Sequence, residues 1–135
     1  MPITALFRII LIAGLFTAII EVVAGMTLVD TLPTILQEYL TQIENEEISD
    51  NTAIMLLIIG VMLIASTIGL WKFKNWARII YIVITIVSLP LYPAMGPIIM
   101  NPWEAMFDNI ALILEGVLIA MMFFSPIHEE FKTKS

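Results

Sequence analysis

The chain of 135 residues contains no cysteine and a single histidine, His128. Without cysteine there are no disulfides, no thiolate metal sites and no covalent haem attachment. With one imidazole per chain, paired histidine ligation of haem or copper is excluded as well. We therefore expect neither a metal nor another cofactor.

Charged residues are also scarce, at 13% of the chain compared with about 25% in an average soluble domain. Six are Lys or Arg and twelve are Asp or Glu, which gives a net charge of −6. That balance argues against a nucleic-acid partner and against an extended polybasic lipid-binding surface, because both need clustered positive charge. The sequence also lacks the motifs of serine hydrolases, zinc proteases and phosphate-binding loops. We therefore expect a protein that is not an enzyme.

Apolar residues are abundant instead, at 60% of the chain, and the mean hydropathy is +0.99. They gather in four stretches, which predict transmembrane helices at about residues 5–29, 52–71, 76–92 and 104–125. Pro90 and Pro93 should end the third helix, and Pro126 should end the fourth. We predict an all-α integral membrane protein in which residues 1–135 form a single four-helix domain.

All of the basic residues lie on one side of these stretches, at Arg8, Lys72, Lys74, Arg78, Lys132 and Lys134. Because Lys and Arg are enriched in cytoplasmic loops, both termini should be cytoplasmic. We predict that a tight hairpin anchors at the cytoplasmic surface through Trp71, Lys72, Lys74, Trp76 and Arg78, with docking of a cytoplasmic partner as the alternative role. Four spans with such a hairpin resemble many small bacterial inner-membrane proteins. The predicted location is therefore the bacterial inner (plasma) membrane.

Residues 30–51 form an acidic segment that this threading places outside the cytoplasm. An amphipathic helix is predicted at about residues 32–45, with an apolar stripe of Leu32, Ile35, Leu36, Tyr39, Leu40 and Ile43. Its polar face carries acids and no Lys or Arg, unlike a helix that binds anionic lipid. We expect the stripe to cover the outer ends of the spans, and the alternative is that it docks a partner.

Two carboxylates fall inside the predicted spans. Glu115 lies near the middle of the fourth span, and Glu21 lies on the outer side of the centre of the first. An ionised carboxylate at such a depth costs at least about 2.5–3.5 kcal/mol, and no Lys or Arg lies there to compensate it. We therefore expect both groups to be buried in protein, where they are protonated, bind a cation or face a polar cavity or a partner subunit.

Small residues share a helix face with Glu21. Gly14, Ala18, Glu21 and Gly25 follow the spacing i, i+4, i+7 and i+11, and small residues allow helices to approach closely in lipid. We predict that Gly14, Ala18 and Gly25 form a helix-packing face, which would direct Glu21 toward protein.

On the fourth span, Asp108 shares a face with Glu115. If the first and fourth spans are neighbours, these groups and Glu21 can share a proton or a cation. Glu21, Glu115 and Asp108 are therefore the candidate proton or cation site. The alternative for each glutamate is a protonated group that is hydrogen-bonded to a facing carbonyl or hydroxyl.

The segment from Glu21 to Leu28 resembles the first helix of small multidrug resistance transporters, four-helix dimers whose membrane glutamate exchanges protons for cationic drugs. The segment reads Glu-Val-Val-Ala-Gly-Met-Thr-Leu, and the match requires a one-residue insertion. The resemblance implies a proton-coupled role for Glu21. The rest of the chain departs from that family, since residues 30–51 replace a short loop and the third span lacks the family's fuller aromatic and glycine pattern. We therefore do not assign the chain to it.

Two functions remain open at this point. Four short helices enclose little room for a permeation pathway within a single subunit. The first hypothesis is therefore a non-enzymatic homo-oligomer or a subunit of a larger membrane complex. The second is a proton- or cation-coupled transporter or channel that uses Glu21 and Glu115. In both cases the lipid bilayer is a partner, and no sequence feature identifies a substrate.

Overall fold

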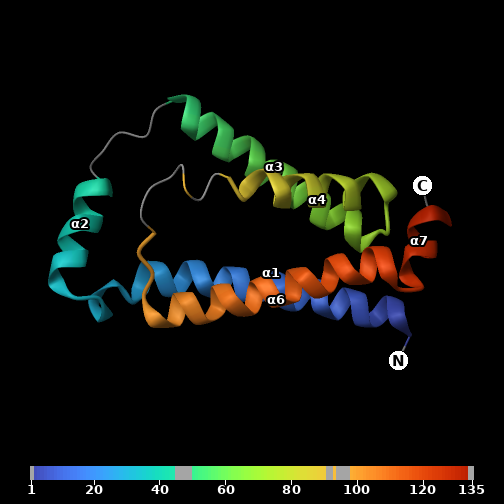
Figure 1. Cartoon of the computed structure of the whole chain (residues 1–135), viewed down its shortest axis with the longest axis horizontal. Coiled ribbons are helices and arrows are strands. Elements are labelled where there is room, and N and C mark those ends of the chain that lie inside the picture. The colour runs from blue at the N-terminus through green and yellow to red at the C-terminus, as the bar shows by residue number, and fades with distance from the viewer. Residues whose placement is uncertain (1, 45–49, 91–92, 94–97, 134–135) are drawn as a thin grey trace.

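The computed structural model describes residues 2–44, 50–90, 93 and 98–133, and over these residues the chain is helical without any strand (Figure 1). The longer helices are α1 (Ile3–Thr27), α3 (Asp50–Trp71), α4 (Asn75–Ser88) and α6 (Pro102–Phe124). The shorter ones are η1 (Val29–Thr31), α2 (Thr34–Glu44) and α7 (Ile127–Thr133). Three segments are long and apolar enough to cross a membrane: Ile3–Thr27, Ala53–Trp71 and Pro102–Phe124. The predicted all-α class and the apolar helices of membrane-spanning length are confirmed.

Helix α4 is shorter than the third predicted span. Its 14 residues rise about 21 Å, compared with an apolar bilayer core of about 30 Å. The helix ends at Ser88, and Pro90 follows two residues later; proline has no N–H with which to continue the helical hydrogen bonds. The predicted end near residue 92 is therefore wrong, and part of that region lies outside the described residues.

The helices form two antiparallel pairs. Helix α1 packs along α6, and α3 packs along α4, whereas α3 contacts α1 over a short region only. Figure 1 shows the N-terminus, the C-terminus and the α3–α4 turn at one end of the molecule, which we call the hairpin end. Helix α2 stands at the opposite end, which we call the α2 end. The two pairs meet at the hairpin end and diverge toward the α2 end.

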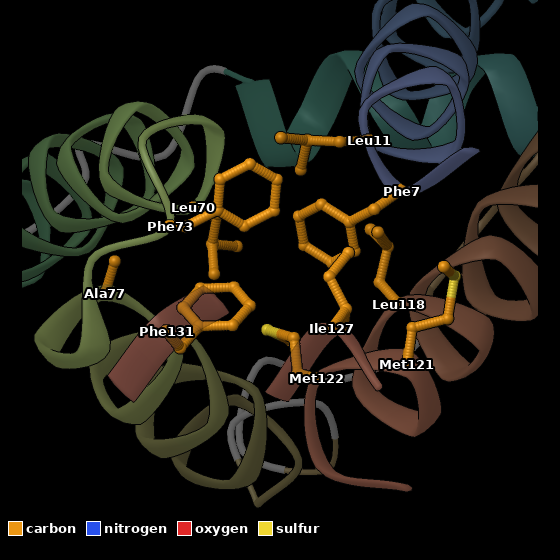
Figure 2. Packing of buried hydrophobic residues seen from close by; sticks show 10 residues of the cluster. All are labelled: Phe7, Leu11, Leu70, Phe73, Ala77, Leu118, Met121, Met122, Ile127 and Phe131. Carbon is orange, nitrogen blue, oxygen red and sulfur yellow. The ribbon is translucent and has the colours of Figure 1, made fainter. Parts of the chain in front are cut away.

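The hydrophobic core lies at the hairpin end (Figure 2). Its centre is a cluster of three aromatic rings from α1, the α3–α4 turn and α7, namely Phe7, Phe73 and Phe131. The ring centroids lie 5.4–5.8 Å apart, which is the usual range for aromatic pairs. Leu11, Leu70, Ala77, Leu118, Met121, Met122 and Ile127 complete the cluster.

The turn between α3 and α4 ends α3 in a Schellman motif. The Lys74 N–H donates to the Gly69 carbonyl at 2.9 Å, and the Phe73 N–H donates to the Leu70 carbonyl at 3.0 Å. This motif needs a left-handed residue, usually glycine, but here Phe73 takes that conformation with φ 55°. The ring of Phe73 is 1% exposed. Its burial in the aromatic cluster offsets the strain in the backbone.

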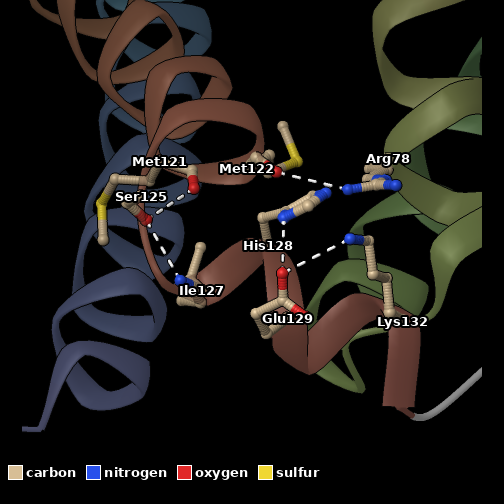
Figure 3. Close-up of polar contacts among 8 residues, drawn as sticks. All are labelled: Arg78, Met121, Met122, Ser125, Ile127, His128, Glu129 and Lys132. Carbon is tan, nitrogen blue, oxygen red and sulfur yellow. Dashed lines mark hydrogen bonds and ion pairs between the residues drawn. The ribbon is translucent and has the colours of Figure 1, made fainter.

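The C-terminal segment folds back onto the bundle as α7, which the sequence analysis did not predict. Pro126 ends α6 as expected, since α6 stops at Phe124 and α7 begins at Ile127. Ile127 and Phe131 are each 0% exposed. They are one helical turn apart, so a single face of α7 enters the core. His128, Glu129 and Lys132 form the polar side of α7, with a contact of 3.3 Å between His128 Nδ1 and Glu129 Oε1 (Figure 3).

Helix α2 covers the end of the bundle only in part. Leu32 and Leu40 line a cavity of about 300 Å³ beside Val22 of α1 and Val29 of η1. Ile35, however, is 73% exposed, and Tyr39 and Ile43 are 37% and 41% exposed. The expectation that the whole stripe packs on the bundle is therefore wrong for these three residues. Figure 1 shows α2 at the end of the bundle, crosswise to α1 and α6.

Candidate functional site

A cavity of about 450 Å³ lies between the two helix pairs, and we call it the interhelical cavity. Leu11, Leu15 and Leu118 are among its apolar lining residues, together with Ile59 and Leu63 of α3. Its polar lining comes from carboxylates on α1 and α6 and from hydroxyls on α3 and α4. These residues are Glu21, Asp108, Glu115, Thr67, Tyr81, Thr85 and Ser88. Among the described residues that line the cavity there is no Lys or Arg, so this part of its wall carries acidic groups without a basic counterpart.

Glu115 connects the two helix pairs. The Thr85 hydroxyl on α4 donates a hydrogen bond of 2.7 Å to Glu115 Oε1 on α6. The Tyr81 phenol, one turn earlier on α4, interacts with the same carboxylate. Hydroxyls one turn apart on one helix face thus converge on Glu115. This is the facing hydroxyl that the sequence analysis gave as the alternative role for an intramembrane glutamate.

Glu21 has a different environment. The charged groups that act on it electrostatically are Asp108 and Glu104, both on α6. Helices α1 and α6 are neighbours, as the shared-site hypothesis required. Their carboxylates nevertheless separate into a Glu21–Asp108 group near the α2 end and a Glu115 group nearer the core. Among the described residues, no three metal-binding side chains come together to hold an ion.

The predicted burial of Glu21 and Glu115 is wrong. Glu21, Asp108 and Glu115 are all half-buried, and no described carboxylate is fully buried. The physical reason is the divergence of the two helix pairs, which leaves the interhelical cavity open beside them. The carboxylates line a cavity wall and are not enclosed in the core.

The small residues of α1 behave differently from one another. A Cβ placed on Gly25 would lie 2.9 Å from Glu104 Oε1, so α1 and α6 approach closely at this position. A Cβ placed on Gly14 would meet no atom within 4 Å. Gly14 and Ala18 line the interhelical cavity. At Gly14, the predicted close helix packing is therefore wrong, because the space beside this glycine is open.

Asn101 joins α6 to α1, a role the sequence analysis missed. Its side-chain oxygen accepts from the Trp103 and Glu104 N–H groups, and Glu104 completes the capping box by accepting from the Asn101 N–H. Its amide group also donates to the Ala24 carbonyl of α1 at 2.9 Å. The Asn-Pro-Trp-Glu sequence signals the helix cap. The bond to Ala24 depends on the fold and has no signal in the sequence.

The predicted anchor residues lie together at the hairpin end. Trp71 and Trp76 flank the α3–α4 turn and are 41% and 47% exposed. Lys72 is exposed beside Trp71, and Lys74 precedes α4. Arg78 donates to the Met122 carbonyl at 3.4 Å (Figure 3). Its guanidinium carbon lies 5.2 Å from the ring centroid of Phe123, so Arg78 holds α4 against α6.

Comparison of the chain with protein-family models, with curated proteins and with solved structures gives no match.

Proposed function

We propose that this chain is a non-enzymatic protein of the bacterial inner membrane that works as a homo-oligomer or as a subunit of a larger membrane complex. One observation carries the proposal: the two helix pairs diverge, and the interhelical cavity between them has three half-buried carboxylates on its wall. In a bilayer, an acidic wall open to lipid is costly. A surface from another subunit that covers the opening removes this cost.

The proposed threading has four crossings with both termini in the cytoplasm. Lys74 starts α4 at the hairpin end, and Asn101 is bonded to Ala24 near the opposite end of α1. The chain between them therefore travels the length of the α1–α6 pair. Helix α4 supplies about 21 Å of this path. The positions of the basic residues favour the hairpin end as the cytoplasmic one.

Cross-linking from neighbouring positions of α6 tests the assembly. Leu112 lines the interhelical cavity and is 52% exposed, whereas Ile113 is 66% exposed and does not line it. Because the chain has no cysteine, Leu112→Cys and Ile113→Cys each introduce one attachment point for a photoactivated cross-linker. In native membranes, Leu112→Cys should give a discrete product of higher mass, and Ile113→Cys should give much less. Equal yields from both positions, with a monomeric mass in native mass spectrometry, would exclude the assembly.

The second candidate is a proton- or cation-coupled transporter or channel. The observation that favours it is the composition of the same cavity, whose described lining residues include three carboxylates and four hydroxyls and no basic side chain. A cation entering such a cavity finds oxygen ligands and no repelling charge. In proteoliposomes, Glu21→Gln and Glu115→Gln should each abolish pH-dependent flux. Glu38→Gln, which alters an exposed position on α2, is the matched control. Flux that is unchanged in both cavity variants would exclude this candidate.

A further inference from the structure

The guanidinium group of Arg8 is held in a fixed place by aromatic rings at the hairpin end. Its central carbon lies 5.0 Å from the ring centroid of Trp71 and 5.2 Å from that of Phe73. Phe73 is anchored in the aromatic core. Stacking on these rings therefore fixes the plane of the guanidinium and leaves its edge free to take up hydrogen-bond acceptors.

The hydrogen-bonding capacity of Arg8 is largely unused. A guanidinium has five N–H donors, and here one terminal nitrogen donates to the Trp71 carbonyl at 3.4 Å, the long limit for such a bond. The Nε atom is buried and has no acceptor. In the described part of the chain Arg8 forms no ion pair, so its positive charge is not compensated by an acidic group there.

The immediate surroundings of Arg8 suit an anion at the depth of the lipid headgroups. Lys72 follows Trp71 in the α3–α4 turn and is exposed. Trp71 is 41% exposed, and tryptophan at the end of an apolar helix favours the headgroup level. Arg8 thus stacks on a tryptophan whose next residue along the chain is an exposed cation, at the end of a helix long enough to span a membrane.

We propose that Arg8, Trp71 and Lys72 form a binding site for the headgroup of one anionic phospholipid. The guanidinium edge of Arg8 binds the phosphate, the Lys72 ammonium adds a second charge, and the Trp71 ring packs against the glycerol region. A lipid is the occupant because the site lies at the end of an apolar helix, where the acyl chains continue along the exposed apolar face of α1. This site is independent of the interhelical cavity and of the proposed assembly.

Arg78 provides a contrast at the same end of the molecule. Its guanidinium is stacked on Phe123 and Phe131 at 5.2 and 5.7 Å and binds the Met122 carbonyl. Figure 3 shows it facing α6 and the start of α7, close to His128. Arg78 shares with Arg8 a bond of 3.4 Å and a buried Nε without an acceptor. The difference lies in the neighbouring charge: the exposed Lys72 follows Trp71, the ring partner of Arg8, whereas the chain neighbours of Arg78, Ala77 and Ile79, are uncharged.

Native mass spectrometry of the full chain tests the lipid site. The protein is equilibrated with equal amounts of phosphatidylglycerol and phosphatidylcholine that have the same acyl chains. The wild type should retain one phosphatidylglycerol in preference to phosphatidylcholine, and Arg8→Gln should lower that preference about fivefold. Arg8→Lys should restore only part of it, because lysine keeps the charge and loses the planar fork.

Two further variants keep the test decisive. Lys132→Gln removes one charge at the same end, where Lys132 already contacts Glu129 at 3.4 Å, and should leave the preference unchanged. Lys72→Gln alters an exposed turn residue without touching the core and should lower the preference even if Arg8→Gln fails to fold. The proposal is overturned if the wild type shows no preference, or if Lys132→Gln lowers it as much as Lys72→Gln. It is also overturned if inorganic phosphate displaces the lipid at equal concentration.

Discussion

Asn101 is the residue on which the α2 end of the α1–α6 pair most depends. It is 1% exposed, caps α6 through its side-chain oxygen and holds α1 through its amide group. One side chain thus satisfies donors at the start of one helix and an acceptor in the last turn of another. A buried polar group with all its bonds made stabilises the structure, whereas its loss leaves several groups unsatisfied.

Replacement of Asn101 by alanine should therefore lower the free energy of unfolding by about 1–2 kcal/mol from the cap alone, with a further loss from the Ala24 carbonyl. Asn101→Ser separates the two effects, because serine can cap a helix but has no amide group to reach Ala24. It should be intermediate in stability. The free energy of unfolding of each variant is measured by titrating the folded protein in mixed micelles with a denaturing detergent. Wild-type stability in the alanine variant would contradict the assigned role.

The carboxylates show the limit of sequence reasoning at this scale. Their depth in the spans identifies Glu21 and Glu115 as unusual. Their partners depend on which helices are neighbours and on how far the pairs diverge. The bond from Thr85 to Glu115 crosses 30 positions of the chain, and no local pattern predicts it. The divergence of the pairs, which leaves the carboxylates half-buried, has no local signal either.

Among the elements, the long helices and the amphipathic α2 were predictable, whereas α7 was not. An apolar stretch of about 20 residues indicates a spanning helix whatever its neighbours are, and α1, α3 and α6 follow that rule. Helix α7 has only two apolar residues that enter the core, Ile127 and Phe131. Two positions one turn apart are too few to establish a helical period. Its docking depends on the ring of Phe7 and on Phe73 in its left-handed turn.

The docking of α7 predicts a large difference between two phenylalanines near the C-terminus. Phe131 is 0% exposed in the aromatic core, whereas Phe124 is 90% exposed at the end of α6. Phe131→Ala should lower the free energy of unfolding by about 3 kcal/mol or more, and Phe124→Ala should leave it nearly unchanged. Unfolding in mixed micelles compares the two variants directly. Equal stability of both would mean that α7 does not dock as described.

Helix α2 offers a similar comparison at the other end. Leu40 lines the small cavity beside α1, and Ile35 is 73% exposed. Leu40→Ser should therefore lower the melting temperature of the isolated protein, because burial of a leucine contributes about 1.5–3 kcal/mol. Ile35→Ser should leave it unchanged. A melting temperature lowered equally by both changes would show that the whole stripe packs on the bundle.

At the scale of the whole molecule, the fold separates charge and packing between its two ends. The hairpin end holds the aromatic core and the basic residues Arg8, Lys72 and Arg78. The α2 end holds the diverging helices and most of the acids among the described residues. The sequence predicts this segregation of charge, because the charges alternate with the spans. The unequal packing along the bundle is a property of how four helices fit together, which hydropathy alone does not determine.

The threading of the chain is the central claim, and α4 is its critical element because it is the shortest of the four long helices. Single cysteines at Glu38, Lys72 and Trp103 report on three connections, and all three positions are exposed. A membrane-impermeant thiol reagent should label positions 38 and 103 in cells whose inner membrane is intact, and position 72 only after that membrane is opened. Protection of position 103 together with position 72 would contradict the account, because the segment containing α4 would then not cross the membrane.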